Sequence, residues 1–200
     1  MIEEARPTRA LLTGFEPFTT GQGLALTHNP TAGMVERVAA RMNGVDAAVL
    51  PVSYAATRAR LTALFDALQP RIWIGLGYAP HRTTLDVETI AVNMEHAVGS
   101  DNDGERPWMR PIIAGAPVAY ESTLDMAMAV DALGAAGVEA KPCFHAGTFL
   151  CNQVFYLGCH RAHTHEHLST AAFIHVPPMK KSDAFERGLA ALVGRLVASV

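Results

Sequence analysis

Residues 72–76 read IWIGL, and Gly77 closes the run. A short apolar run that ends at a glycine predicts a strand buried on both faces, as in a parallel sheet covered by helices. The preceding residues 55–68 carry leucine and phenylalanine at helical spacing and end at a Gln-Pro pair. A helix followed by a buried strand is the repeating unit of an α/β fold.

Strand-like and helix-like segments alternate along the whole chain. Predicted strands cover residues 9–13, 45–51, 72–76, 88–93, 138–144 and 171–176. Predicted helices cover residues 30–42, 55–68 and 124–133, a run that begins near Cys151, and a run capped by Ser182. Asn29 is a good N-cap ahead of Pro30. The alternation predicts one domain over residues 1–200, a three-layer α/β/α sandwich with a central twisted, largely parallel mixed sheet.

The composition excludes several classes of partner. Half of the 200 residues are hydrophobic, which is ample for a core, and the formal net charge is −3. That charge predicts no basic surface for nucleic acid and no polybasic membrane patch, and no apolar run is long enough to span a bilayer. The acidic start lacks the features of a signal peptide, and three cysteines cannot all pair. We therefore expect reduced thiols and a cytoplasmic protein.

Residues 143–159, CFHAGTFLCNQVFYLGC, contain the most informative candidate for chemistry. A β-leaning run ends at the small-residue turn 146–148, and a helix-like run then begins with Cys151 in its first turn. The unpaired N–H groups and the positive end of the helix dipole favour thiolate over thiol at this position. Cys151 is therefore a candidate nucleophile.

Two further residues stand in comparable places beside predicted strands. Glu88 opens a strand-like run, and His175 lies near the end of FIHV. Histidine suits the transfer of the thiol proton, and a carboxylate can fix the imidazole tautomer. Cys151, His175 and Glu88 would form a triad like that of cysteine peptidases. The spacing alone also allows a structural thiol, a core histidine and a solvated carboxylate.

Several motifs in order along the chain resemble one family. They are LLTGFEPF followed by Asn29-Pro30, ETIAVN from Glu88, SDNDGERP from residue 100, AGTFLCNQVFY around Cys151, and FIHVP around His175. Together these motifs resemble pyroglutamyl peptidase I, or pyrrolidone-carboxylate peptidase, a family of cytoplasmic cysteine peptidases. The resemblance places Cys151, His175 and Glu88 on the catalytic positions of that family.

The resemblance implies an activity and a set of contacts. The enzyme would remove an N-terminal pyroglutamyl residue from small peptides through an acyl-enzyme, without a cofactor. Phe15, Phe18, Asn29 and Tyr78 match substrate-pocket positions, and Arg82 would serve as an oxyanion donor. The backbone N–H of Cys151 is a second donor that the helix start supports on physical grounds. By resemblance alone, a homo-oligomer, either a tetramer or a dimer, is expected.

The chain departs from the family pattern around the acyl pocket. Tyr78 stands where the family has a glutamine, and Pro80 and His81 stand where it has glycines. Two alternatives therefore remain open. One is a related thiol-dependent N-acyl amide hydrolase with altered acyl specificity, and the other is a catalytically retired binding protein.

Two other segments give further predictions. Metal-ligand residue types gather between residues 159 and 167, but their spacing matches no strong zinc signature, so we predict no metal and keep a zinc hydrolase as a rival. The members of this group are Cys159, His160, His163, His165, Glu166 and His167. Residues 99–117, which include Trp108, predict a long excursion that contributes to a subunit contact or to the site entrance.

Overall fold

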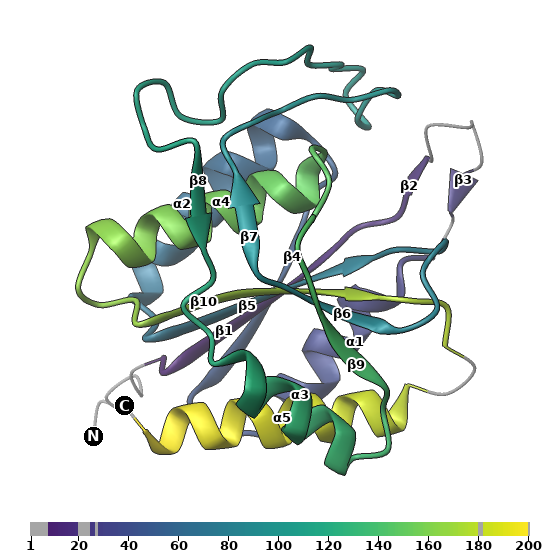
Figure 1. Ribbon diagram of the computed structural model, residues 1–200, viewed down its shortest axis with the longest axis vertical. Helices are drawn as coiled ribbons and strands as arrows, with labels where there is room; N and C mark the ends of the chain where they lie inside the picture. Colours follow the sequence, from purple (N-terminus) through teal and green to yellow (C-terminus); the bar gives the residue numbers. More distant parts are fainter. Residues whose placement is uncertain (1–7, 20–24, 27, 180–181, 200) are drawn as a thin grey trace, which may run out of the picture.

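The computed structural model describes residues 8–19, 25–26, 28–179 and 182–199. A six-stranded sheet forms its centre, in the order β4-β1-β5-β10-β6-β9 (Figure 1). The strands are β1 (Ala10–Phe15), β4 (Val45–Leu50), β5 (Ile72–Tyr78), β6 (Leu85–Glu88), β9 (Ala140–Cys143) and β10 (Thr170–Val176). All neighbours are parallel except β6 and β10. The predicted largely parallel mixed sheet is confirmed.

Helices cover both faces of this sheet and complete the predicted three-layer sandwich (Figure 1). One face, called here the α5 face, packs against α1 (Pro30–Ala39), α3 (Met126–Ala135) and α5 (Asp183–Ala198). The opposite face, called the α4 face, packs against α2 (Tyr54–Leu68) and α4 (Leu150–Thr164). The predicted triad residues Cys151, His175 and Glu88 lie on the α4 face.

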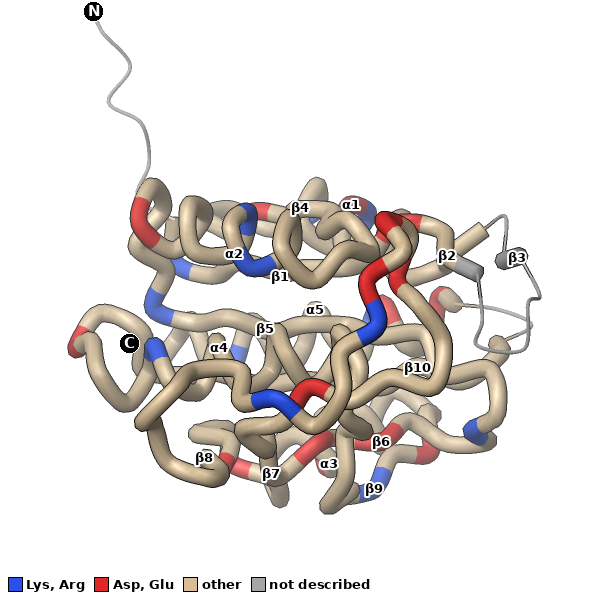
Figure 2. The backbone as a smooth tube through the Cα atoms, turned by 90° about the horizontal axis from the view of Figure 1, so that it is seen from above, with Lys and Arg blue, Asp and Glu red and all other residues tan. Residues whose placement is uncertain are grey.

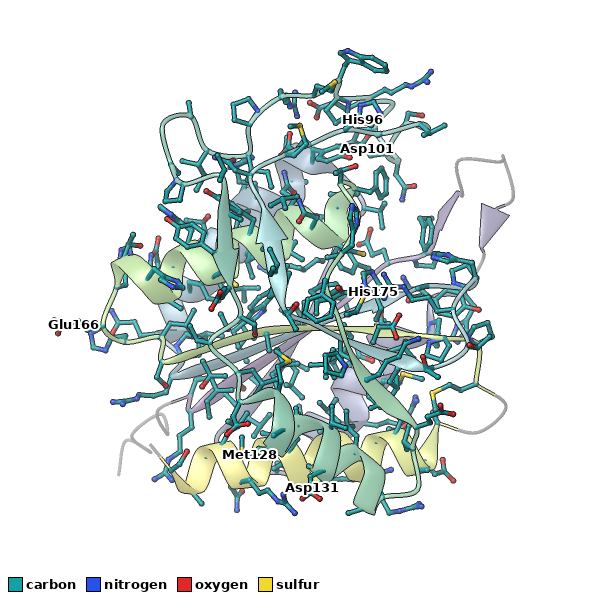
Figure 3. The ribbon with its side chains drawn as sticks, viewed as in Figure 1. His96, Asp101, Met128, Asp131, Glu166 and His175 are labelled. Carbon is teal, nitrogen blue, oxygen red and sulfur yellow. The ribbon has the colours of Figure 1, made fainter. Side chains whose placement is uncertain are left out.

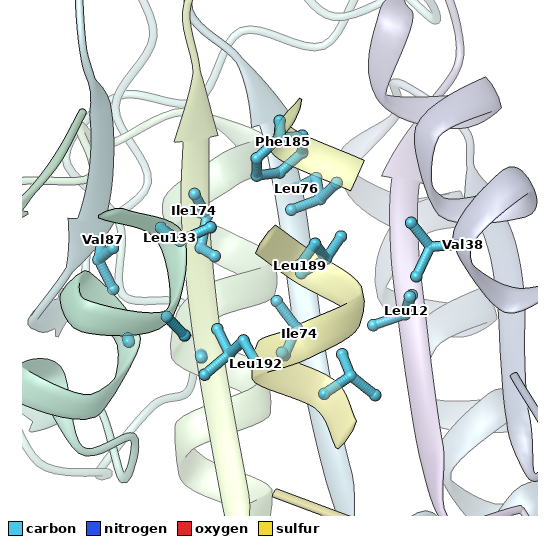
Figure 4. Packing of buried hydrophobic residues seen from close by; sticks show 14 of the residues in the cluster. Leu12, Val38, Ile74, Leu76, Val87, Leu133, Ile174, Phe185, Leu189 and Leu192 are labelled. Carbon is cyan, nitrogen blue, oxygen red and sulfur yellow. The ribbon is translucent and has the colours of Figure 1, made fainter. Parts of the chain in front are cut away.

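The alternation of side chains along β5 supplies both cores. Ile74 and Leu76 point to the α5 face, where strand and helix side chains interdigitate (Figure 4). Trp73 points to the α4 face and is fully buried among aromatic residues. Burial of one such side chain stabilises the fold by about 1.5–3 kcal/mol. The two glycines of the same strand, Gly75 and Gly77, leave room on the α4 face.

The helix caps only partly follow the prediction. Asn29 caps α1, with its Oδ1 accepting from the Thr31 backbone N at 3.1 Å, and Pro30 is the first helical residue. Ser182 is the N-cap residue of α5, but its side chain accepts no backbone N–H. Its hydroxyl instead donates to Glu186 Oε1 at 2.7 Å. The predicted capping bond of Ser182 is wrong: its backbone has helical angles, φ −85° and ψ −14°, instead of the extended angles that direct an N-cap oxygen to the first N–H groups.

Residues 88–93 do not form the single predicted strand. Glu88 ends β6, and Ile90–Val92 forms a separate strand, β7, which pairs with β8 (Ala119–Glu121) outside the main sheet. Thr89 marks the break, because its backbone N and its hydroxyl both donate to Cys143 O. The structure also contains a short antiparallel pair that was not predicted, β2 (Phe18–Thr19) with β3 (Ala25–Leu26).

The predicted excursion leaves the fold between β7 and β8 (Figure 1). A bridge between Glu95 and Arg110 ties its two arms, and Val98, Trp108 and Met109 are exposed along it.

Acidic and basic positions are interspersed over the chain (Figure 2). Within the described residues, none of the helices combines the length and hydrophobicity needed to cross a bilayer.

Candidate active site

His175 lies near the carboxyl end of β10, close to the centre of the molecule (Figure 3). Its sheet neighbours are Gly77 of β5 and Asp86 of β6. Glu88 lies two residues further along β6 and therefore shares a face with Asp86. Nδ1 of His175 is 2.7 Å from Glu88 Oε1, and both side chains are buried. The antiparallel register of β6 and β10 makes this diagonal pair, which long side chains can span.

The contact with Glu88 fixes the tautomer of the imidazole. A carboxylate only accepts hydrogen bonds, so Nδ1 of His175 donates and Nε2 of the neutral ring is left as an acceptor. Burial lowers the pKa of His175 below its ordinary value, although the hydrogen bond and charge of Glu88 oppose this effect. A neutral imidazole with a lone pair on Nε2 is suited to accept a thiol proton.

Cys151 is the second residue of α4 and is half-buried, so its predicted place in the first turn is confirmed. A methyl group added at Gly77 would lie only 2.8 Å from Cys151 Sγ, which shows that the thiol sits against this glycine. Gly77 is the β5 neighbour of His175. The thiol and the imidazole therefore come from adjacent positions on the α4 face.

The charge state of Cys151 differs from the one predicted from its helix position. Burial, and after it the negative charge of Glu88, raises the pKa of Cys151 to about 12. The positive charge of Arg82 and the backbone N–H of Cys151 lower it, in the direction that the helix start predicts. Burial outweighs these groups, so the resting pair is a thiol beside a neutral imidazole.

Arg82 belongs to the turn that follows β5, and its guanidinium lies beside Glu88. Nη1 is 2.8 Å from Glu88 Oε1 and also forms an ion pair with Asp86. Nη1 is 3.3 Å from Cys143 Sγ, and Nη2 donates to His145 O at 3.1 Å. Both terminal nitrogens are thus engaged with groups of β6, β9 and the turn before α4.

The predicted pocket residues lie at the ends of β1 and β5 and in the loop between β1 and α1. Phe15 ends β1 on the α4 face and is buried, and Phe18 is half-buried nearby in sequence. Asn29 Nδ2 donates to Glu16 O at 3.0 Å while its Oδ1 caps α1, so its side chain holds this loop. Tyr78 is the last residue of β5, where alternation places it on the face of Leu76 rather than that of Gly77.

Two buried polar residues that sequence reasoning missed follow the thiol. The Asn152 side chain accepts from Val92 N at 3.0 Å and donates to Val92 O and Met94 O at 2.8 and 3.0 Å. Gln153 Nε2 donates to Glu95 Oε1 at 2.7 Å. These bonds join the start of α4 to β7 and to the excursion. The sequence signal was the polar pair Asn-Gln inside an otherwise apolar helix.

A groove of about 720 Å³ lies away from this cluster, between α2 and the excursion. Gln153 lines it, but Cys151, His175 and Glu88 do not. Buried Glu95 stands at its base, where Arg58 and Arg110 form ion pairs with it. These salt bridges anchor the excursion on the α2 side.

The residues between 159 and 167 do not converge on a metal position. Nδ1 of His160 is 2.9 Å from Tyr120 OH, and Nδ1 of His163 is 2.8 Å from Cys159 O. Nδ1 of His165 is 2.9 Å from the Thr164 hydroxyl. In the part of the chain that the structure describes, no group of three or more His, Cys, Asp or Glu side chains could hold a metal ion.

Comparison with protein families gives one match across most of the chain. The family model described as pyroglutamyl peptidase matches residues 8–193. The pyrrolidone-carboxylate peptidase of Pyrococcus furiosus is 38% identical over 176 residues, which cover 84% of this chain and 80% of the relative. That of Pseudomonas fluorescens is 36% identical over 198 residues, covering 92% and 90%.

Comparison with solved structures agrees. The crystal structure of Bacillus amyloliquefaciens pyroglutamyl peptidase I superposes with a TM-score of 0.86 at 28% identity, covering 96% of this chain and 97% of that one. The resemblance drawn from the sequence motifs is therefore confirmed.

Proposed function

The chain belongs to the pyroglutamyl peptidase family, and from this premise we propose that it removes an N-terminal pyroglutamyl residue from small peptides with a blocked N-terminus. One observation carries the proposal. His175 donates to Glu88 at 2.7 Å, and the Cys151 thiol lies against the sheet neighbour of His175. A thiol, an imidazole and a carboxylate in this order are the components of a cysteine peptidase.

In the proposed reaction, the first half forms an acyl-enzyme. Nε2 of His175 takes the proton of the Cys151 thiol, and Sγ attacks the carbonyl carbon that links pyroglutamate to the next residue. Glu88 stabilises the imidazolium that forms. When the tetrahedral intermediate collapses, the C–N bond breaks, and the imidazolium gives its proton to the departing amine. The pyroglutamyl group remains on Sγ as a thioester.

In the second half of the reaction, water is the nucleophile and the Cys151 thiolate is the leaving group. Nε2 of His175 takes a proton from water, the hydroxide attacks the thioester carbonyl, and pyroglutamate leaves as the C–S bond breaks. The thiolate recovers the proton from His175. Because the resting pair is neutral, proton transfer accompanies attack, and Glu88 lowers its cost by favouring the imidazolium.

The backbone N–H of Cys151 is the proposed oxyanion donor. It lies in the first turn of α4, where N–H groups have no partner within the helix. The predicted donor role of Arg82 is less well supported, because its terminal nitrogens already contact Glu88, Asp86 and His145 O. We assign Arg82 to the support of Glu88.

Pyroglutamate is a flat, neutral lactam, so its pocket requires apolar faces and a few amide partners. We propose that Phe15 and Phe18 contact the ring and that Asn29 keeps their loop in place. The predicted contact of Tyr78 is less well supported, because alternation places its side chain on the face of Leu76 rather than that of Gly77. If Tyr78 excludes the lactam, the same triad serves an N-acyl amide hydrolase with another acyl preference.

Release of a fluorescent amine from a pyroglutamyl amide tests the function. We expect turnover by the wild type, loss of turnover in Cys151→Ser, and no effect of a chelator. A folded wild-type protein that cleaves other N-acyl amides, but not this one, would favour the altered-pocket alternative. Loss of activity with the chelator and not with a thiol alkylator would favour a metal enzyme.

Two properties of the whole protein complete the proposal. We propose a homo-oligomer, because the excursion exposes Val98, Trp108 and Met109; sedimentation at micromolar concentration tests it. We also propose a cytoplasmic location, which agrees with the free thiols of Cys143, Cys151 and Cys159. Cell fractionation tests the location.

A further inference from the structure

A second carboxylate, Asp86, stands beside the proposed triad. It is buried, and in the register of β6 and β10 it lies directly across from His175, nearer along the strand than Glu88. The imidazole nevertheless bonds to Glu88. Two carboxylates of β6 therefore lie beside one histidine, and only one of them, Glu88, bonds to it.

The contacts of Arg82 Nη1 explain why the imidazole bonds to Glu88 and not to Asp86. Nη1 contacts one oxygen of Asp86 and, at 2.8 Å, Oε1 of Glu88, the same oxygen that accepts from His175. The other oxygen of Asp86 accepts from the Thr84 hydroxyl at 3.1 Å, with Lys141 Nζ at 3.9 Å. Asp86 is thus occupied on both oxygens, which leaves Glu88 to the imidazole.

On the basis of the proposed function, we propose that Asp86 is a positioning residue for the reaction. It holds the Arg82 guanidinium against Glu88 and, through that contact, sets the orientation and the electrostatic environment of His175. Figure 2 shows the acidic positions of β6 with a basic position of the neighbouring β9 beside them.

The charges around His175 explain why Asp86 matters. From β6 the imidazole faces Asp86 and Glu88, and from the turn after β5 it faces Arg82. On α4, the thiol of Cys151 lies against Gly77, the β5 neighbour of His175. From β5 it faces Gly77, which carries no charge. With Asp86 present, the two carboxylates and the Arg82 guanidinium sum to one negative charge, which stabilises the imidazolium and which the exposed Lys141 ammonium, 3.9 Å from Asp86, partly offsets. Without Asp86, the group is neutral and the imidazolium loses that support.

The substitution Asp86→Asn removes the charge and keeps the shape. The pKa values of His175 and Cys151 should both fall, because a nearby negative charge favours the protonated form of each group. Both limbs of the pH profile of kcat/KM should move to lower pH by about half a unit to one unit. Asp86→Glu keeps the charge, so both limbs of its pH profile should lie at the wild-type pH values even if its maximal rate is lower.

Asp131→Asn is the matched control. Asp131 lies on α3, across the sheet from His175, and its exposed carboxylate pairs only with Arg195 among the interactions described (Figure 3). This control removes one negative charge and should leave the limbs in place. If Asp86→Asn lowers the rate or the melting temperature without moving the limbs, Asp86 is merely structural and the proposal fails.

A second variant covers the case in which Asp86→Asn does not fold. Lys141 is exposed and lies 3.9 Å from Asp86. Lys141→Gln removes a positive charge, so the limbs should move to higher pH, by about 0.2 unit or more. Absence of this shift, or a shift to lower pH, would overturn the proposal.

A readout without substrate separates this proposal from the proposed function. The rate at which iodoacetamide alkylates Cys151, followed by mass spectrometry of the peptide that contains it, reports the same protonation states. If the wild type cleaves no pyroglutamyl amide, the proposed function fails. The alkylation profiles of wild type, Asp86→Asn and Asp131→Asn still test Asp86, and coincident profiles would refute its role.

Discussion

Gly77→Ala is the substitution that should disturb the position of the Cys151 thiol most selectively. A methyl group at Gly77 would lie 2.8 Å from Cys151 Sγ and 2.8 Å from the Phe173 ring, on the α4 face of β5. Atoms of this kind pack at about 3.5–4.0 Å, so Gly77→Ala forces the thiol or the ring to move by up to ~1 Å. A misplacement of about 1 Å at a reacting atom costs about 100-fold in rate.

Gly75→Ala is the matched control for this experiment. Its methyl group would lie 2.6 Å from the same Phe173 ring and 2.8 Å from Trp73, and no contact with Cys151 is among its nearest. Overpacking of this kind costs about 1–3 kcal/mol of stability in either variant. In a domain of this size, that is a fall in melting temperature of roughly 2–12 °C.

The assay compares kcat/KM on a pyroglutamyl amide with the alkylation rate of Cys151 in both variants. We expect the two variants to lose similar stability, while Gly77→Ala loses about 100-fold in kcat/KM and changes the reactivity of Cys151. Gly75→Ala should retain most of its activity. Equal activity in the two folded variants would refute the placement of the thiol against Gly77.

Glu88→Gln removes the hydrogen-bonded charge that raises the pKa of His175, so the acid limb of kcat/KM should move to lower pH and kcat should fall about 10²- to 10⁴-fold; an unchanged pH profile would contradict this. Asn152→Ala abandons three buried bonds, and urea unfolding should show a loss of about 3 kcal/mol or more; a loss below about 1 kcal/mol would disprove the anchoring role. Tyr78→Phe should change kcat/KM less than about threefold, because alternation turns this side chain from the face of Gly77; a tenfold loss would place the hydroxyl in the pocket.

The layers of the fold were accessible from the sequence because local patterns determine them. The IWIGLG run predicts a strand buried on both faces, and its second glycine, Gly77, is the place where the Cys151 thiol of α4 lies against the sheet. Asn29 and Pro30 mark the start of α1 by chemistry that acts within a few residues. In such segments the sequence pattern and the tertiary structure agree.

Other features depended on contacts between distant segments. The run ETIAVN reads as one strand, but the bonds from Thr89 to Cys143 divide it between two sheets. The antiparallel direction of β6, which brings Glu88 to His175, leaves no local signal either. The raised pKa of Cys151 could not be predicted, because the helix start is visible in the sequence and the burial that opposes it is not.

The central claim is that Cys151 carries the acyl group during turnover. Rapid acid quenching of the enzyme with a pyroglutamyl ester, followed by mass spectrometry of the intact protein and of its peptides, tests it most directly. We expect a transient mass increase of one pyroglutamyl group on the peptide that contains Cys151, absent in Cys151→Ala. Turnover that persists in Cys151→Ala, or an adduct on another residue, would contradict it.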